Sequence, residues 1–254
     1  MTPKTWPFKS FYWLPCIWIN NSSAPTIFDK NLILILSCKS TLKFRTDEGL
    51  ITAVEDVSFS LNRGEVMGLV GESGSGKSVT AKALMHLNAR NALYDPESSI
   101  ILHTDRGPVD VLSLRRPADL KVVRGGALSM IFQEPMTSLN PLHTIEKQIG
   151  ESLRQHQGMS VEAARARTLD LLHRVGIPGA ETRLASYPHE LSGGQRQRVM
   201  IAMALANNPD MLIADEPTTA LDVTIEAQIL DLLADLKRAE GLSMLFITHD
   251  LGVV

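Results

Sequence analysis

The chain has 254 residues, with 25 basic and 28 acidic side chains and a formal net charge of −3. Its length suits one large α/β domain, and its hydrophobic fraction of 44% is ordinary for a protein with a packed core. A charge this evenly balanced produces no strong basic field, so nucleic acid is not favoured as a partner.

Neither the apolar runs nor the cysteines indicate a membrane-spanning or metal-binding protein. No apolar run approaches the roughly 20 residues that a membrane-spanning helix requires. The two cysteines, Cys16 and Cys38, do not have the spacing of metal ligands and are too few for a disulfide scaffold. We therefore expect a reducing, intracellular compartment, and any role at a membrane must come through a partner.

The first forty residues differ from the rest of the chain. All three tryptophans and both cysteines lie there, without a helical or strand period. We expect residues 1–40 to be an atypical arm and a candidate for disorder, either an added segment or translated sequence upstream of the true start. Residues 41–254 are then the folded domain.

From Lys43 onward, short apolar runs alternate with segments of helical period. This alternation indicates a mostly parallel sheet, and a helical block at about 138–208 indicates an inserted subdomain. Strands are expected at 53–61, 64–70, 127–132, 211–214 and 243–248. Helices are expected from 76–78 to about Leu87, within 141–175, over 195–208, and over 225–240, where Gly241 closes the last one.

The segment "GESGSGKS" (71–78) fits the phosphate-loop pattern G-x-x-x-x-G-K-[ST]. It follows a buried strand and opens a helix, so its backbone amides can surround phosphate oxygens. Lys77 would reach the terminal phosphates and Ser78 would ligate Mg²⁺. An ordinary Gly/Ser turn is the alternative. The predicted ATP contacts are Gly71, Glu72, Ser73, Gly74, Ser75, Gly76, Lys77, Ser78 and Val79.

Two carboxylates, Asp215 and Glu216, stand where the apolar strand in "MLIADEPTTALD" ends. Ligands of open α/β sheets bind at that edge. Asp215 is expected to hold Mg²⁺ through water, and Glu216 to orient or deprotonate an attacking water. The alternative, a solvated acidic turn, is disfavoured because the chain also carries a phosphate loop.

Five motifs, in the order "GESGSGKS", "LSGGQ", "LIADEP", "TALD" and "ITHD", resemble the nucleotide-binding domain of ABC transporters. The resemblance covers about Lys43 to Val254. It implies a P-loop NTPase fold of ABC type: α/β, with a mostly parallel sheet core, an antiparallel N-terminal β subdomain and an inserted helical subdomain. The segments "MIFQEPMTSLNP" and "YPHELSGGQRQRVMIAMAL" look like those of the ATPase subunits of oligopeptide, dipeptide and glutathione importers.

The resemblance also assigns roles to single residues. Gln133 matches the Q-loop, which reaches Mg²⁺ and the attacking water. His249 matches the switch histidine, which binds the γ-phosphate and so joins Lys77 and Glu216 as a catalytic candidate. Asp222 matches the loop that crosses the dimer interface. Phe44 is the candidate for stacking on adenine, with a core role as the alternative.

The "LSGGQ" segment has no lysine after its glycines, and a polar turn precedes it. It offers a serine, glycine amides and a helix N-terminus, which together can receive an anion. The resemblance implies that these residues bind ATP in trans, on the phosphate loop of a second domain. They are Leu191, Ser192, Gly193, Gly194 and Gln195.

The function implied by the resemblance is ATP hydrolysis that drives import of peptides or related small solutes, with ATP and Mg²⁺ as cofactors. The implied partners are integral-membrane permease subunits, a second ABC ATP-binding domain and, indirectly, an extracytoplasmic solute-binding protein. The implied location is the cytoplasmic face of the bacterial inner membrane. Residues 138–153 would receive a permease helix or would simply be core helix.

Two other functions stay open at this point: a soluble ABC ATPase that acts on nucleic acid or ribosomes, and a truncated module that binds ATP without turnover. The sequence stops at Val254, five residues after His249. We therefore expect a fragment or the front part of a tandem chain.

Overall fold

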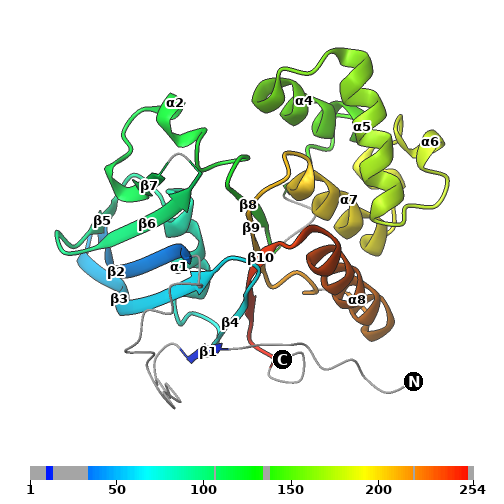
Figure 1. Cartoon of the computed structure of the whole chain (residues 1–254). Coiled ribbons are helices and arrows are strands. Elements are labelled where there is room, and N and C mark those ends of the chain that lie inside the picture. Colours follow the sequence, from blue (N-terminus) through cyan, green and yellow to red (C-terminus); the bar gives the residue numbers. More distant parts are fainter. Residues whose placement is uncertain (1–9, 14–33, 106, 134–137, 220, 251–254) are drawn as a thin grey trace. The chain divides into compact units, whose positions relative to one another are not determined.

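The structure is a computed structural model that describes residues 10–13, 34–105, 107–133, 138–219 and 221–250. The chain forms two compact units, which are treated separately below. Unit 1 comprises residues 1–123 and 241–254, and unit 2 comprises residues 124–240. Figure 1 shows the elements of both units along the chain.

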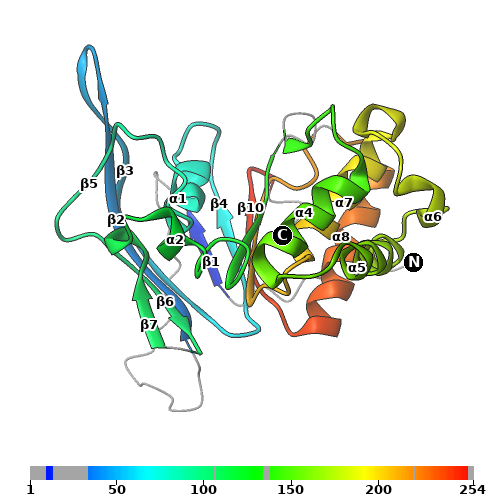
Figure 2. The same cartoon turned by 90° about the horizontal axis from the view of Figure 1, so that it is seen from above.

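An antiparallel sheet with the strand order β3-β2-β6-β7 forms one part of unit 1, and β5 also pairs with β2. In β3, buried Val57, Phe59 and Leu61 alternate with exposed Ser58 and Ser60, which is typical of a sheet with one face on the core. Figure 2 shows β2 and β3 as a long hairpin. The strands are β2 (Leu34–Thr46), β3 (Gly49–Asn62), β5 (Ala92–Tyr94), β6 (Ser99–Thr104) and β7 (Gly107–Asp110).

Three parallel strands form the other part of unit 1. They are β1 (Ser10–Trp13), β4 (Val66–Val70) and β10 (Ser243–Thr248), with β4 paired to both others. Every residue of β4 and β10 is buried, as expected of short apolar runs in a parallel sheet. The short helices of unit 1 are α1 (Lys77–Leu84), η1 (Val111–Ser113) and α2 (Pro117–Leu120).

Helix α1 is shorter than the sequence predicts. It ends at Leu84, and Met85 is its C-cap residue, whereas the expected end is about Leu87. His86 then takes a positive φ of 53°, which helical backbone does not allow. The amide of Leu87 nevertheless donates to the carbonyl of Lys82, so the segment stays folded against the helix end.

Regular structure begins earlier than Lys43. Strand β1 lies within the expected arm, and β2 begins at Leu34. A period was not visible in β1 because four residues are too few to establish one. The remainder of the arm, residues 1–9 and 14–33, lies outside the described residues.

Burial raises the pKa of the Cys38 thiol to about 12, so this free cysteine stays protonated and packs as a small apolar residue.

Unit 2 combines two parallel strands with a group of helices. Strand β8 (Leu128–Ile131) pairs with β9 (Met211–Asp215), and every residue of β9 is buried. The expected helical stretch 141–175 divides in two, because Gly158 ends the first helix with φ 66°. The helices are α4 (Ile145–Gln157), α5 (Val161–Arg174), α6 (Ala180–Arg183), η2 (Pro188–Glu190), α7 (Gly193–Leu205) and α8 (Val223–Glu240).

These elements confirm the predicted α/β class, with parallel strands, an antiparallel N-terminal sheet and a helical block. None of the helices in the described part of the chain has both the length and the apolar character that a bilayer crossing requires.

A single serine joins the loop before β4 to the start of β10. The Gly64 amide donates to Ser243 Oγ at 2.9 Å, and Ser243 is only 1% exposed. We predict that Ser243→Ala lowers the free energy of unfolding by about 1 kcal/mol, because it leaves that amide without its acceptor. Urea unfolding measures the change. Exposed Ser58→Ala is the control, and an equal effect of both substitutions would contradict the prediction.

Candidate active site

The phosphate loop of unit 1 is held in shape by its own lysine. Lys77 is only 4% exposed, and its Nζ donates to the carbonyl oxygens of Gly71 at 2.7 Å and Glu72 at 2.8 Å. An ammonium at this point faces into the loop and satisfies two backbone acceptors. The loop is therefore already curved around a positive charge, as a phosphate site requires.

Gly76 has to be a glycine for two independent reasons. Its φ is 91°, a conformation that residues with a Cβ rarely adopt. A Cβ at this position would also lie 2.5 Å from the carbonyl oxygen of Ala53 on β3. The loop thus passes close against the antiparallel sheet just before α1 begins.

His249 lies at the same sheet edge as the phosphate loop. In the parallel pair β4 and β10, Val70 is in register with Thr248, so Gly71 and His249 directly follow neighbouring strand ends. The Thr248 hydroxyl accepts a hydrogen bond from the Asp250 amide at 3.0 Å, which shapes the turn around the exposed histidine. The carboxyl edge of parallel strands is where ligands of such sheets bind.

Unit 2 repeats this arrangement with Gln133 and Glu216. Ile131 of β8 is in register with Ala214 of β9, and the two polar residues each lie two positions further on. Gln133 Nε2 donates to Glu216 Oε2 at 2.9 Å. The structure therefore brings together Gln133 and Glu216, which are 83 positions apart and belong to two different motifs.

The neighbouring carboxylate has a different environment. Asp215 is the last residue of β9 and is only 2% exposed, whereas Glu216 is half-buried. The two adjacent carboxylates therefore differ in their exposure to solvent.

Glu216 forms a sharp backbone corner with a positive φ of 46°. For a residue with a Cβ this conformation costs about 1–2 kcal/mol, so neighbouring contacts must hold it. The buried Gln197 of α7 donates its side-chain amide to the carbonyl of Pro217. The Thr219 hydroxyl donates to Glu216 Oε2 at 3.0 Å, and Thr218 donates to Glu226 Oε1 at 2.7 Å.

Sequence reasoning missed Gln197 and Thr219. A usable signal existed for Gln197, because it shares a helical stripe with buried Ile201 and Ala204 at i+4 and i+7. A polar residue on such a stripe needs a buried partner. For Thr219 no comparable signal exists, because its partner depends on the conformation of the turn.

The "LSGGQ" segment begins α7 as a capping box. Gln195 N donates to Ser192 Oγ at 3.3 Å, and Ser192 N donates to Gln195 Oε1 at 3.0 Å. The amides of Gly193 and Gly194 have no intrahelical acceptor because they belong to the first turn. A Cβ on Gly194 would lie 2.8 Å from Ile225 Cγ2, so α7 packs closely against α8 at this glycine.

Two further candidates have clear local structural roles. Asp222 caps α8, because its Oδ1 accepts from the Ile225 amide at 2.9 Å. Phe44 lies on β2, in register with Ile51 of β3 and Ala92 of β5, and its side chain is half-buried. The dimer-loop role of Asp222 and the adenine role of Phe44 stay predictions.

The predicted Mg²⁺ ligands supply a hydroxyl, an amide and a carboxylate, which are oxygen donors of the kind that Mg²⁺ prefers. Ser78 belongs to unit 1, whereas Gln133 and Asp215 belong to unit 2. Within the described residues, no group of three or more His, Cys, Asp or Glu could hold a metal by itself. The donors of each unit, taken separately, fit Mg²⁺, because this ion is usually bound by one or two protein groups together with waters and phosphates.

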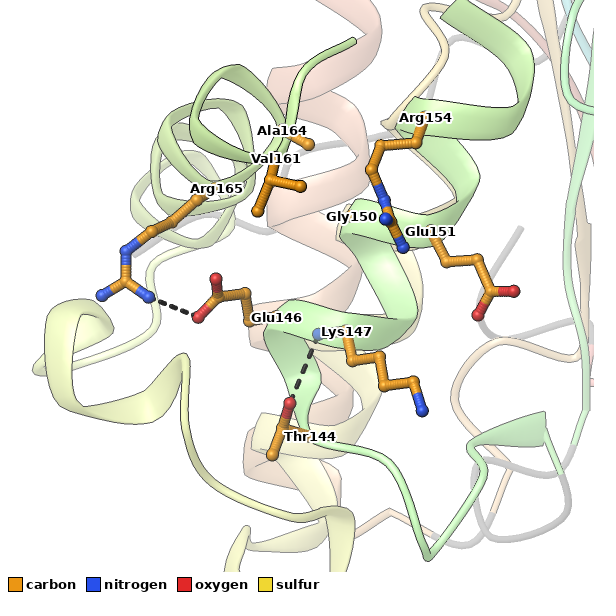
Figure 3. A pocket seen from close by; sticks show the side chains of 9 residues that line it. All are labelled: Thr144, Glu146, Lys147, Gly150, Glu151, Arg154, Val161, Ala164 and Arg165. Atoms are coloured by element: carbon orange, nitrogen blue, oxygen red, sulfur yellow. Dashed lines mark hydrogen bonds and ion pairs between the residues drawn. The ribbon is translucent and has the colours of Figure 1, made fainter. Parts of the chain in front are cut away.

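A separate cavity of about 260 Å³ lies between α4 and α5 in unit 2. Figure 3 shows charged side chains around it, with Arg165 turned toward Glu146 at an N···O distance of 2.5 Å. None of the predicted nucleotide-binding residues lines it, so this cavity is not the phosphate site. Its lining residues are Thr144, Glu146, Lys147, Gly150, Glu151, Arg154, Val161, Ala164 and Arg165.

Comparison with known proteins gives one consistent family. The peptidoglycan transport ATP-binding protein YejF of Agrobacterium fabrum is 63% identical over 202 residues, which cover 80% of this chain and 36% of that protein. A putative peptide import ATP-binding protein of Brucella ovis is 56% identical, with coverage of 83% and 62%. The glutathione import ATP-binding protein GsiA of Escherichia coli K12 is 52% identical, with coverage of 84% and 34%.

Solved structures agree with these relatives. The dimeric ATP-binding cassette MJ0796, bound to ADP and phosphate, superposes with a TM-score of 0.73 at 31% identity, covering 86% of this chain and 90% of that one. The cbiO1 protein of Clostridium perfringens, part of the ABC transporter complex cbiONQ, gives a TM-score of 0.69 at 26% identity, covering 87% and 81%.

The chain spans between about one third and two thirds of the length of these curated relatives. The sequence pattern of the ABC transporter family matches residues 54–219, which is more than half of the chain and includes the phosphate loop, "LSGGQ" and both carboxylates. The chain therefore belongs to the ABC transporter family.

Proposed function

We propose that the chain is the ATP-hydrolysing part of an ABC importer for peptides or related small solutes. The observation that carries the proposal is the carboxylate of Glu216, held by the amide of Gln133 at the end of β9. A fixed carboxylate at a strand end suits the orientation of a water molecule. The same chain has a preshaped phosphate loop around Lys77.

Hydrolysis proceeds by in-line attack of water on the γ-phosphate of ATP. Lys77 and the loop amides stabilise the charge of the transferred group. Glu216 orients the water and accepts its proton, and His249 donates a hydrogen bond to the γ-phosphate. Ser78, Gln133 and a water on Asp215 would hold Mg²⁺, which when bound would supply further neutralisation of phosphate charge.

A second ABC domain completes each site. The exposed Ser192 and the glycine amides at the N-terminus of α7 form an anion receptor without a cation of its own. They cap ATP held by the phosphate loop of the partner domain. The dimeric state of the cassette MJ0796 supports this arrangement.

The solute class and the membrane partners rest on the relatives. Their names specify peptidoglycan transport, peptide import and glutathione import, all of which concern peptides or peptide-containing solutes. We place the chain at the cytoplasmic face of the bacterial inner membrane, where permease subunits bind it and a solute-binding protein delivers the solute from outside. These names favour transport over an action on nucleic acid.

Residues 138–153 are the proposed contact with the permease. Leu142 in this segment is a large apolar side chain that is 81% exposed, and five residues of the segment line the cavity of Figure 3. A short permease helix with apolar and charged side chains would match this surface.

Removal of the carboxylate charge tests hydrolysis. We expect Glu216→Gln to lower kcat for ATP at least about 100-fold while ATP still binds, because general-base catalysis contributes that much. Phosphate release and nucleotide-binding titrations measure the two properties. The control is Glu97→Gln, since the Glu97 side chain is 82% exposed in unit 1. Equal turnover by the unsubstituted chain and the Glu216 variant would overturn the proposed chemistry.

Substitution of Ser192 tests ATP binding in trans. We expect Ser192→Arg to leave ATP binding by the monomer within about twofold but to abolish ATP-driven dimerisation, because a bulky cation blocks the receptor for the partner's nucleotide. Size-exclusion chromatography with light scattering measures dimer formation. A large loss of monomer affinity would contradict the trans role.

Substitution of Leu142 tests the permease contact. We expect Leu142→Asp to prevent co-purification with co-expressed permease subunits of a peptide importer, without change in ATP turnover by the isolated chain, because a charge replaces an apolar contact. Leu50→Asp is the matched control, since Leu50 is 59% exposed in the antiparallel sheet. The proposed contact fails if both variants retain the permease equally well.

A further inference from the structure

We propose that Thr219 is the positioning residue that keeps the Glu216 carboxylate in place during hydrolysis. The inference rests on the proposed function and adds to it a role for Thr219, the first residue of "TALD", to which the resemblance assigns none. The Thr219 hydroxyl donates to Glu216 Oε2 at 3.0 Å. It is a positioning residue because it acts on the water only through the carboxylate that it holds.

Two side chains donate hydrogen bonds to the same carboxylate oxygen, Glu216 Oε2, and they come from different parts of the backbone. Gln133 Nε2 reaches Glu216 Oε2 at 2.9 Å from the end of another strand, β8. Thr219 belongs to the same turn as Glu216, and its backbone amide donates to the Glu216 carbonyl at 3.1 Å. Any displacement of the turn therefore carries Thr219 together with the carboxylate, whereas Gln133 can separate from it.

The proposed reaction needs a donor that moves together with the Glu216 carboxylate. The amide oxygen of Gln133 is a predicted Mg²⁺ ligand, and a reorientation of this side chain on metal binding would weaken the hydrogen bond from its nitrogen to Glu216. The hydroxyl of Thr219 then preserves the orientation of Glu216. A β-branched side chain suits this task because its χ1 angle is restricted.

The turn that carries Thr219 is itself fixed at both sides. Buried Gln197 donates to the Pro217 carbonyl, and Thr218 donates to Glu226 Oε1 of α8 at 2.7 Å. The Leu221 amide donates to the Thr218 carbonyl at 3.2 Å. These contacts keep the positive-φ corner at Glu216 formed, so the threonine hydroxyl faces its carboxylate in a fixed geometry.

The experiment compares Thr219→Val, which keeps the shape and removes the donor, with Thr219→Ser, which keeps the donor. We expect the valine variant to lower kcat about 10-fold with KM for ATP within about twofold, the loss expected for one hydrogen bond to a charged group. The serine variant should restore at least about half of the activity. Thr182→Val is the matched control, because it removes a hydroxyl of α6 that donates to the carbonyl of the N-cap residue Gly179.

A double substitution separates positioning from a general structural role. In single-turnover measurements, Thr219→Val should have no further effect in the Glu216→Gln background, because the two substitutions remove the same function. The inference is overturned if the valine variant matches the unsubstituted chain, if valine and serine are equally impaired, or if the valine substitution costs as much in the Glu216→Gln background. If the unsubstituted chain turns over ATP no faster than Glu216→Gln, the proposed function fails instead.

Discussion

The candidate active site depends on the backbone corner at Glu216. A buried parallel strand directs its side chains above and below the sheet, so a carboxylate that must meet a ligand has to leave the strand by a turn. Glu216 does so with a φ of 46°, a conformation that an L-residue adopts only under constraint. The constraint comes from the side-chain amide of Gln197 on Pro217 and from the hydroxyl of Thr219 on the carboxylate. In the proposed site, helix α7 therefore has two tasks: its first turn would offer amides to an anion, and its buried face fixes the turn at Glu216.

Strand register explains why distant motifs meet. In unit 1, Val70 and Thr248 are in register, so the phosphate loop and His249 leave the sheet side by side. In unit 2, Ile131 and Ala214 are in register, and Gln133 and Glu216 are hydrogen-bonded two residues later. Both pairs have the same cause: the carboxyl ends of neighbouring parallel strands lie at the same edge of the sheet, so the polar residues that follow them lie close together.

The sequence predicted the elements that show a regular hydrophobic pattern or a known motif. Buried strands such as 64–70 and 243–248 were visible because a strand covered on both faces has an unbroken apolar run. The phosphate loop was visible because glycine is required where φ is 91° and where a Cβ would meet the carbonyl of Ala53. The pairing of Gln133 with Glu216 was predictable in outline, because each follows a buried strand.

The remainder depends on backbone conformation that no residue pattern specifies. The hydrogen bond from Thr219 exists only because the turn after Glu216 brings position 219 back to its carboxylate. The early end of α1 depends on the positive φ of His86, for which histidine gives no distinctive signal. Strand β2 begins before the expected boundary. Buried positions such as Leu36 and Cys38 alternate with more exposed ones in this strand, and this alternation of burial results from its pairing with β3 and β6.

The central claim is that each active site combines the phosphate loop and Glu216 of one chain with the "LSGGQ" helix start of another. It is tested most directly by mixing two inactive variants, Glu216→Gln and Ser192→Arg, and measuring ATP hydrolysis. A mixed head-to-tail dimer contains one site with an intact carboxylate from one chain and an intact serine from the other. Mixing should therefore restore hydrolysis well above that of either variant alone, since each mixed dimer has one working site. A mixture as inactive as its components would contradict the shared site.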